Sequence, residues 1–226
     1  MSGQRLREAL FGWALSSVVL AVLTVGVQVG GGTGLRRTLT DLLLIATLVV
    51  GIQSFVGNSG IVSFGHVAFT GVGAYAAALV AIPPVVKEQI LTGIPTWLAQ
   101  LQLGLLPAIA VGTVAAVALA AVTGGAMARM RELAFAMATL ALLVLVHAVL
   151  ANWDSVTRGG YGIYGIPSST TLWVALAGLV VVHLVARLYR ASQPGLRLQA
   201  TREDPISSAA TGIHVVRTRF GGWVLS

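Results

Sequence analysis

The sequence has no cysteine and few charged residues, and each deficit excludes a class of protein. Without cysteine among its 226 residues, disulfide staples and thiolate metal sites are excluded. Only 9% of the residues are charged, against roughly 25% in typical soluble domains. Seven acidic and fourteen basic residues are too few to coat a core when hydrophobic residues make up 56% of the chain. Lipid must therefore solvate the outside of the fold.

Acidic residues are scarcer than basic ones, but the resulting net charge of +7 does not indicate nucleic-acid binding. The basic residues lie scattered in short segments between apolar runs. A nucleic-acid interface would gather them in one patch with interleaved aromatic residues. Their placement instead describes membrane topology.

Long apolar runs predict transmembrane helices. The first, over residues 10–29, is longer than a signal-peptide core and has no convincing small-x-small cleavage site, so we interpret it as a retained span. The other runs long enough to cross a bilayer are 39–56, 61–82, 103–123, 133–151 and 171–189. They are continuous and lack the alternation of barrel strands. The sequence predicts an all-α, polytopic transmembrane bundle of six spans.

Basic residues between the spans predict that the N-terminus is cytoplasmic, because cytoplasmic loops are rich in arginine and lysine. In that orientation the residues on the cytoplasmic side are Arg5, Arg7, Arg129, Arg131, Arg187, Arg190, Arg197, Arg202, Arg217 and Arg219. Those on the outer side are Arg36, Arg37, Lys87 and Arg158. Trp97, Trp153 and Trp173 then fall near the outer surface and Trp13 near the inner one, where headgroups favour such rings.

The last residues predict an unfinished seventh span. After the polar stretch 190–219, an apolar run begins at Phe220 and stops at Ser226. Seven residues cannot cross a bilayer. We therefore expect residues 1–226 to form a single transmembrane domain that is incomplete at its C-terminus.

Residues 57–75 contain five glycines and a histidine at the start of the third predicted span. On a continuous helix, one face would carry Ser59, Ser63, His66, Thr70 and Gly73. One interpretation is close packing on a neighbouring helix, with hydrogen bonds between helices. The other is a helix broken near its glycines, whose freed backbone groups line a path for a zwitterionic solute. The candidate path residues are Gly57, Gly60, Ser63, His66, Thr70 and Gly73.

Residues 157–167 form a second glycine cluster in the predicted outer loop. The clustered glycines and the terminal Pro167 exclude a regular helix. The segment is either a surface turn or a folded loop that closes the outer mouth of a path and contacts a delivery protein. The glycines of interest are Gly159, Gly160, Gly162 and Gly165.

The predicted inner loop contains signals for a short helix. Asp204 is a good N-cap, Pro205 suits the first helical position, residues 206–211 form about two turns and Gly212 ends them. The helix either lies against the bundle or docks into a partner protein. The residues assigned to docking are Arg202, Glu203, Asp204, Ala209, Ala210 and Gly212.

No catalytic or metal-binding constellation is visible in the sequence. His66, His147 and His183 stand apart from one another, and no nucleophile–base pair or carboxylate pair accompanies them. Only Asp41 lies near a span, which disfavours a proton-driven secondary transporter. A membrane-embedded enzyme is disfavoured as well. Without a nucleotide-binding motif in the chain, any ATP would act on partner subunits.

The three segments, in this order, resemble the permease subunits of branched-chain amino-acid ABC transporters, of the LivM-like branch. The signature of that family is reproduced at Gly57, Gly60, Ser63, Gly65, His66, Phe69, Gly71, Gly73, Ala74 and Tyr75. Similarity continues through residues 131–140, 165–167 and 195–204, and at Ala209 and Gly212. It covers nearly the whole chain after the first span.

The resemblance implies a permease subunit, without its own ATPase site, that imports leucine, isoleucine and valine across a bacterial inner membrane. Its implied partners are a second permease, two cytoplasmic ATPases that bind ATP and Mg²⁺, and a soluble substrate-binding protein. The stretch 190–219 would be the coupling loop. The chain departs from the family at Tyr161, Pro205 and Ser208, and the first change leaves urea and short amides as rival substrates. The family also continues beyond this loop, which agrees with an incomplete chain.

Overall fold

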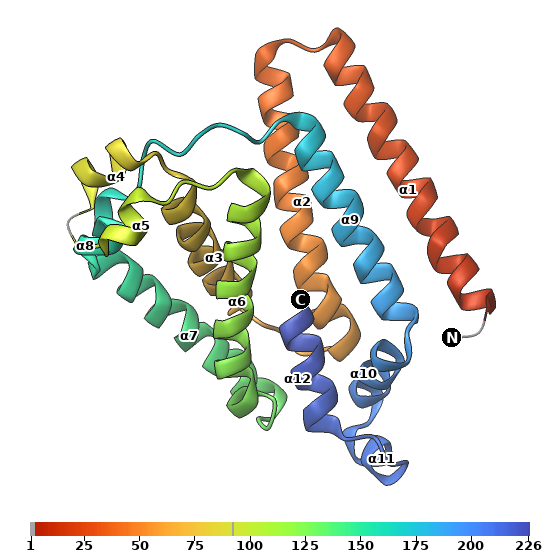
Figure 1. Ribbon diagram of the computed structural model, residues 1–226. Coiled ribbons are helices and arrows are strands. Elements are labelled where there is room, and N and C mark those ends of the chain that lie inside the picture. The colour runs from red at the N-terminus through yellow and green to blue at the C-terminus, as the bar shows by residue number, and fades with distance from the viewer. Residues whose placement is uncertain (1–2, 92) are drawn as a thin grey trace. The chain divides into compact units, whose positions relative to one another are not determined.

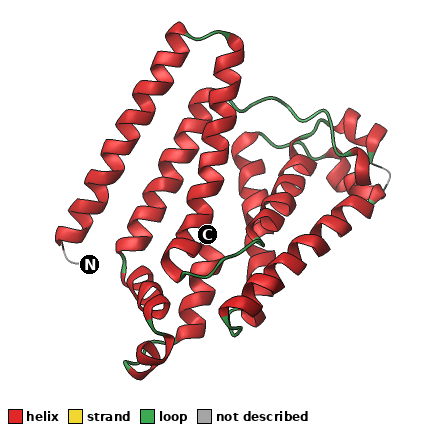
Figure 2. Ribbon diagram, turned by 180° about the vertical axis from the view of Figure 1, so that it is seen from behind, coloured by secondary structure: helices red, strands yellow, loops and turns green. Residues whose placement is uncertain are grey.

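The computed structural model describes residues 3–91 and 93–226, and every regular element within them is a helix (Figures 1 and 2). The all-α prediction is confirmed. Five of these helices are long and apolar enough to cross a membrane. They are α1 (Gly3–Gly30), α2 (Thr33–Ser59), α6 (Leu105–Met127), α7 (Glu132–Asn152) and α9 (Leu172–Ala191). A sixth span exists if α3 (His66–Ala81) and α4 (Pro84–Ile90) count as one, although they meet at a bend of 118°.

The third predicted span begins later than expected. The prediction of a helix over 61–82 was wrong at its start, because α2 extends to Ser59 and α3 begins only at His66. Gly60 ends α2 in the left-handed region at φ 71°, and its N–H donates to the carbonyl of Val56. Glycine adopts this conformation without the Cβ clash that other residues meet. The polar stripe expected from Ser59 to Gly73 therefore does not lie on one helix.

The described chain forms two compact units, and the first comprises residues 3–61 and 170–226. In this unit α9 packs against both α1 and α2, as Figure 1 shows. Its apolar core joins α2 and α9 through Leu43, Leu172, Ala175, Leu176 and Leu179. The indole N–H of Trp13 donates to the carbonyl of Val180 at 3.0 Å, which fixes α1 on α9.

Three shorter helices complete the first unit: α10 (Gln193–Glu203), α11 (Pro205–Ala210) and α12 (Val215–Leu225). The sequence signals predicted α11, whereas α10 was not expected. Ser192 caps α10 by accepting from the N–H of Gly195, and proline occupies its first turn. These are ordinary start signals for a helix. Helix α12 begins at Val215, before the apolar run that was expected to start at Phe220.

The second unit comprises residues 62–169, with α3 packed on α6 and α7. Glycines permit a close crossing of α3 and α6: a Cβ on Gly112 would lie 2.6 Å from the carbonyl oxygen of Gly73. Small residues at such a crossing let two helix backbones approach. The shorter elements of this unit are α4, α5 (Thr96–Gln100), α8 (Asp154–Thr157) and a 3₁₀ turn η1 (Gly159–Tyr161).

Large apolar side chains remain exposed along the long helices of both units. Examples are Phe11 at 73%, Val22 at 65%, Leu106 at 76% and Val122 at 80% exposure. Water would penalise so much apolar surface, whereas a lipid bilayer solvates it. The structure is that of a multi-pass membrane protein.

Candidate functional site

Helix α11 forms where the sequence predicts it, because its first turn is capped. Asp204 Oδ1 accepts a hydrogen bond from the N–H of Ile206 at 2.8 Å, and Oδ2 accepts one from the hydroxyl of Ser207. Pro205 occupies the first position, where an N–H would lack a partner. At the other end Gly212 adopts φ 86°, and its N–H donates to the carbonyl of Ala209. The predicted N-cap and terminating glycine are confirmed.

The cap also determines the charge of the first turn of α11. The hydrogen bond from the Ser207 hydroxyl, with those from the N–H groups of Ile206 and Ser207, holds the pKa of the Asp204 carboxyl below its ordinary value. Each of these bonds favours the ionised form. A negative charge at this position also interacts favourably with the N-terminal end of a helix dipole. Asp204 is therefore a carboxylate at neutral pH.

One face of α11 is exposed and apolar. Ile206 is 83% exposed, and Ala209 and Ala210 are exposed on the same side, three and four residues further on. Ser208 points the other way and is buried. An exposed isoleucine flanked by small residues can enter a groove of another protein. Ala209 and Ala210 were predicted to dock from the sequence, whereas Ile206 was not.

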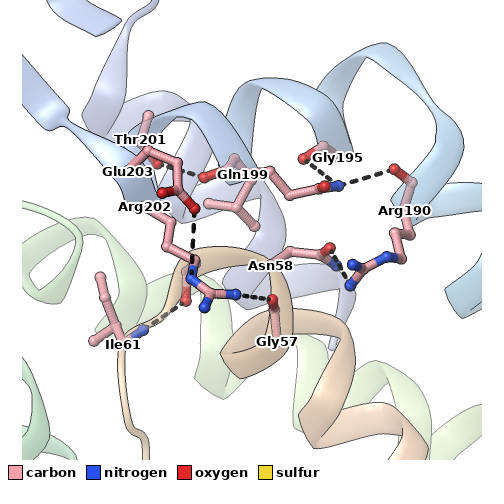
Figure 3. A network of polar contacts seen from close by, with 11 residues as sticks. Gly57, Asn58, Ile61, Arg190, Gly195, Gln199, Thr201, Arg202 and Glu203 are labelled. Carbon is pink, nitrogen blue, oxygen red and sulfur yellow. Dashed lines mark hydrogen bonds and ion pairs between the residues drawn. The ribbon is translucent and has the colours of Figure 1, made fainter. Parts of the chain in front are cut away.

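Arg202 ties α10 to the end of α2 (Figure 3). Its Nη1 donates to the carbonyl oxygen of Gly57 at 3.1 Å, across 145 residues of sequence. Its aliphatic stem lies over Gly60, where an added Cβ would come within 2.8 Å of Arg202 Cγ. Glu203 forms an ion pair with Arg202 at 4.0 Å and is otherwise solvated, with 83% of its side chain exposed.

A second contact supports the same junction. Arg190 Nη1 donates to Oδ1 of Asn58 at 3.5 Å, and Gln199 Nε2 donates to the Arg190 carbonyl at 3.0 Å (Figure 3). Leu198 on α10 is completely buried. The end of α2 is thus held by the polar segment that precedes α11. From the sequence, Arg202 was expected to take part in docking, and its junction with α2 was not predicted.

A cavity of about 570 Å³ lies beside the end of α11, in the same unit. Its lining includes Gly212, His214, Arg197 and Arg217. No acidic residue lines it. The surface around α11 therefore combines an exposed isoleucine with a basic hollow.

The remaining predicted path residues belong to the second unit. His66 is buried at the start of α3, and its Nδ1 lies 2.9 Å from the hydroxyl of Ser63. Thr70 donates to the carbonyl of His66 at 3.1 Å. The N–H of Phe64 donates to Thr139 Oγ1 on α7 at 3.2 Å, which holds the non-helical connector in place. Gly73 lies at the crossing with α6. The described residues contain no group of histidine and carboxylate side chains that could hold a metal ion.

The glycine cluster of residues 157–167 is a folded loop packed within the second unit. Three of its four glycines have positive φ: 54° at Gly159, 67° at Gly162 and 78° at Gly165, whereas Gly160 does not. A Cβ at Gly159 would meet Asp154 Oδ1 at 2.1 Å, and one at Gly165 would meet Val86 Cγ1 at 2.9 Å. The only helical turn among these glycines is the short η1. This agrees with the predicted exclusion of a regular helix.

Lys87 of α4 organises the neighbouring part of this unit and was not identified as a site residue. It is completely buried, and its Nζ donates to the carbonyls of Leu98, at 3.0 Å, and Leu101. These carbonyls belong to the C-terminal end of α5, where a positive charge is favourable. The available signal was that Lys87 is the single lysine in the sequence.

Comparison with known proteins identifies a family for this chain. Residues 34–226 match the family described as the permease component of branched-chain amino acid transport systems. Nothing among the curated proteins and nothing among the solved structures matches the chain. The match spans α2 to α12 and includes both the glycine-rich end of α2 and the capped helix α11. On this match the chain belongs to the family of branched-chain amino acid transport permeases.

Proposed function

We propose that the chain is a transmembrane permease subunit of an ATP-binding-cassette importer, which translocates branched-chain amino acids with energy from ATP hydrolysed on partner subunits. The observation that carries the proposal is the junction of Arg202 with Gly57 and Gly60. It joins the capped helix α11, through α10, to the glycine-rich end of a membrane-spanning helix. Movement imposed on α11 by a partner would reach α2 directly.

The proposed orientation places α11 in the cytoplasm, where an ATPase can reach it. Positive residues concentrate on that side, including Arg190, Arg197 and Arg202. The exposed Ile206, Ala209 and Ala210 would enter a groove of the ATPase. The basic hollow beside Gly212 would face acidic side chains of the same partner. A second permease, a pair of ATPases that bind ATP and Mg²⁺, and a soluble substrate-binding protein complete the proposed assembly.

In the proposed mechanism, the subunit performs no covalent chemistry. ATP-driven closure of the partner ATPases would shift α11 and α10 together, since Asp204 is the only residue between them. Arg202 would pass that shift to the last turn of α2. Gly60, already in the left-handed region, can absorb a change in backbone angles at that point. The permease would then alternate between outward-open and inward-open states.

The test is ATP-driven uptake in proteoliposomes that contain the chain with its partner subunits and binding protein. Ala209→Trp should abolish leucine uptake while ATP hydrolysis continues, because the added ring prevents α11 from seating. Ala118→Trp is the matched control, since Ala118 is exposed on α6, outside the docking surface. Normal uptake by Ala209→Trp would contradict the coupling role. Uptake without ATPases would indicate a secondary transporter, and uptake of urea or short amides in place of leucine would change the substrate.

A further inference from the structure

A second cavity, of about 250 Å³, opens between α2 and α9 in the first unit. Six of the nine residues that line it are polar or charged, although it lies between two membrane-spanning helices. The lining residues are Val49, Val50, Gln53, Ser54, Asn58, His183, Ala186, Arg187 and Arg190. Polar groups that face a membrane groove need a partner, because each costs free energy when left without one.

Two arginines of α9 give this cavity a positive charge that is not neutralised. Arg187 Nε donates to His183 Nε2 at 3.3 Å, and Arg190 reaches only the neutral side chain of Asn58, at 3.5 Å. In the described parts of the chain, neither arginine forms an ion pair with a carboxylate. The α2 wall supplies Gln53, Ser54 and Asn58, which are all uncharged.

Helix α1 does not neutralise the cavity either. It presents Gly12 to the Arg187 guanidinium and Ser16 to the ring of His183, where Ser16 Oγ lies 3.3 Å from Nε2. The nearest acidic residue along α1, Glu8, is exposed and forms no ion pair with Arg187. The groups facing the site from all three helices are therefore neutral or positive. This charge fits an anion and leaves no carboxylate for an ammonium group, so it disfavours a zwitterionic solute.

An apolar row continues directly from the cavity along α2. Leu42, Ile45 and Val49 are 56%, 56% and 57% exposed. At helical spacing they lie on the same face as Gln53, and Val49 and Gln53 both line the cavity. A molecule that fills the site would thus meet two arginines at one end and exposed aliphatic side chains at the other. That pattern fits an amphiphile with an anionic head.

We infer that this cavity binds an anionic phospholipid, with its phosphate on Arg187 and Arg190 and an acyl chain along Leu42, Ile45 and Val49. Guanidinium groups bind phosphate through paired N–H donors, and basic pockets between membrane-spanning helices bind anionic headgroups. The site adjoins the proposed coupling junction, with which it shares Arg190 and Asn58. Its placement in the cytoplasmic leaflet rests on the proposed orientation. Inorganic phosphate could bind the same two arginines, but it has no acyl chain to contact the aliphatic side chains of α2.

The experiment measures binding of phosphatidylglycerol to the purified protein in neutral detergent, by native mass spectrometry at fixed salt. The double variant Arg187→Gln/Arg190→Gln should bind about 30-fold more weakly, if each arginine contributes about 1 kcal/mol. The variant Arg129→Gln/Arg131→Gln is the control, because it removes two exposed basic residues on the same predicted side. Its binding should weaken far less. Leu42→Ser/Val49→Ser should also weaken lipid binding while both arginines remain.

Competition separates the two sources of phosphate. Inorganic phosphate at millimolar concentration should not displace the lipid, and phosphatidylcholine should bind more weakly than phosphatidylglycerol. Equal losses in the two arginine variants would show nonspecific attraction and overturn the site. Displacement by inorganic phosphate, or unchanged binding in Leu42→Ser/Val49→Ser, would overturn the lipid assignment. Circular dichroism of each variant at 222 nm checks that the helices are intact, and Arg187→Lys/Arg190→Lys should restore part of the affinity if charge is the cause.

Discussion

At the scale of single residues, the backbone at the end of α2 depends on glycine. Gly60 has φ 71° and lies beneath the aliphatic stem of Arg202. We expect Gly60→Ala to lower the free energy of unfolding by about 1–2 kcal/mol, because an L-residue is less stable than glycine in the left-handed region by this amount. The thermal unfolding midpoint in detergent should fall accordingly. Gly26→Ala is the control: its Cβ meets nothing within 4 Å, and alanine is the better helix former, so an equal fall there would contradict the argument.

Asp204 provides a prediction about pH at the same scale. The Asp204 pKa is lowered in the folded state, chiefly by the hydrogen bond from the Ser207 hydroxyl. The stabilisation that the ionised Asp204 gives to the helix cap is therefore fully present at pH values above the ordinary aspartate pKa. That contribution is lost as pH falls through the lowered pKa. We expect Ser207→Ala to raise the Asp204 pKa toward its ordinary value, as measured by the carbon-13 shift of the carboxyl group. Thr211→Val is the control, because the Thr211 hydroxyl donates to the Ser208 carbonyl, and this change should leave the Asp204 pKa unchanged. If Asp204 titrates identically in Ser207→Ala and in the unmodified protein, the proposed cap is wrong.

At the scale of elements, the crossing of α3 and α6 tolerates little added volume. A Cβ on Gly112 would approach the Gly73 carbonyl oxygen to 2.6 Å, and a backbone atom cannot swing aside as a flexible side chain can. Gly112→Ala should therefore cost about 1–3 kcal/mol through overpacking. The thermal unfolding midpoint, followed by circular dichroism at 222 nm, measures this cost. Gly125→Ala on the same helix is the control, because a Cβ added at Gly125 would meet nothing within 4 Å, and this variant should keep its stability. If Gly112→Ala is as stable as the control, the close crossing is refuted.

The elements also show which features could be predicted from the sequence. Helix α11 was predictable because its signals are local: Asp204, Pro205 and Gly212 stand within nine residues of one another. Helix α10 carries equally local signals at Ser192 and Pro194, but its polarity favoured interpretation as a loop. The connector before His66 was not predictable from hydrophobicity, because residues 61–65 begin the same apolar run that continues into α3. The glycines at 57 and 60 did indicate a broken helix, and α2 ends there.

Long-range contacts explain the features that the sequence could not show. The connector's Phe64 N–H is satisfied by Thr139, 75 residues away, so the chain can leave the helix without losing that bond. The junction of Arg202 with Gly57 spans 145 residues. No local pattern at either position specifies the other. The candidate residues were therefore identifiable one by one, whereas their connections required the fold.

At the scale of the whole molecule, the proposed function requires α11 and the outer glycine loop to lie on opposite sides of the membrane. The distribution of basic residues predicts this, and the absence of cysteine makes it directly measurable, since a single introduced thiol has no background. Thr211, at the end of α11, and Tyr161, 90% exposed in the outer loop, are suitable positions. A charged maleimide does not cross the membrane of an intact cell. We expect it to label Tyr161→Cys in intact cells and Thr211→Cys only after lysis, because the two positions should face opposite solvents. Labelling of both positions from outside would exclude the six-span topology, and the reversed pattern would place α11 beyond the reach of any cytoplasmic ATPase and refute the proposed mechanism.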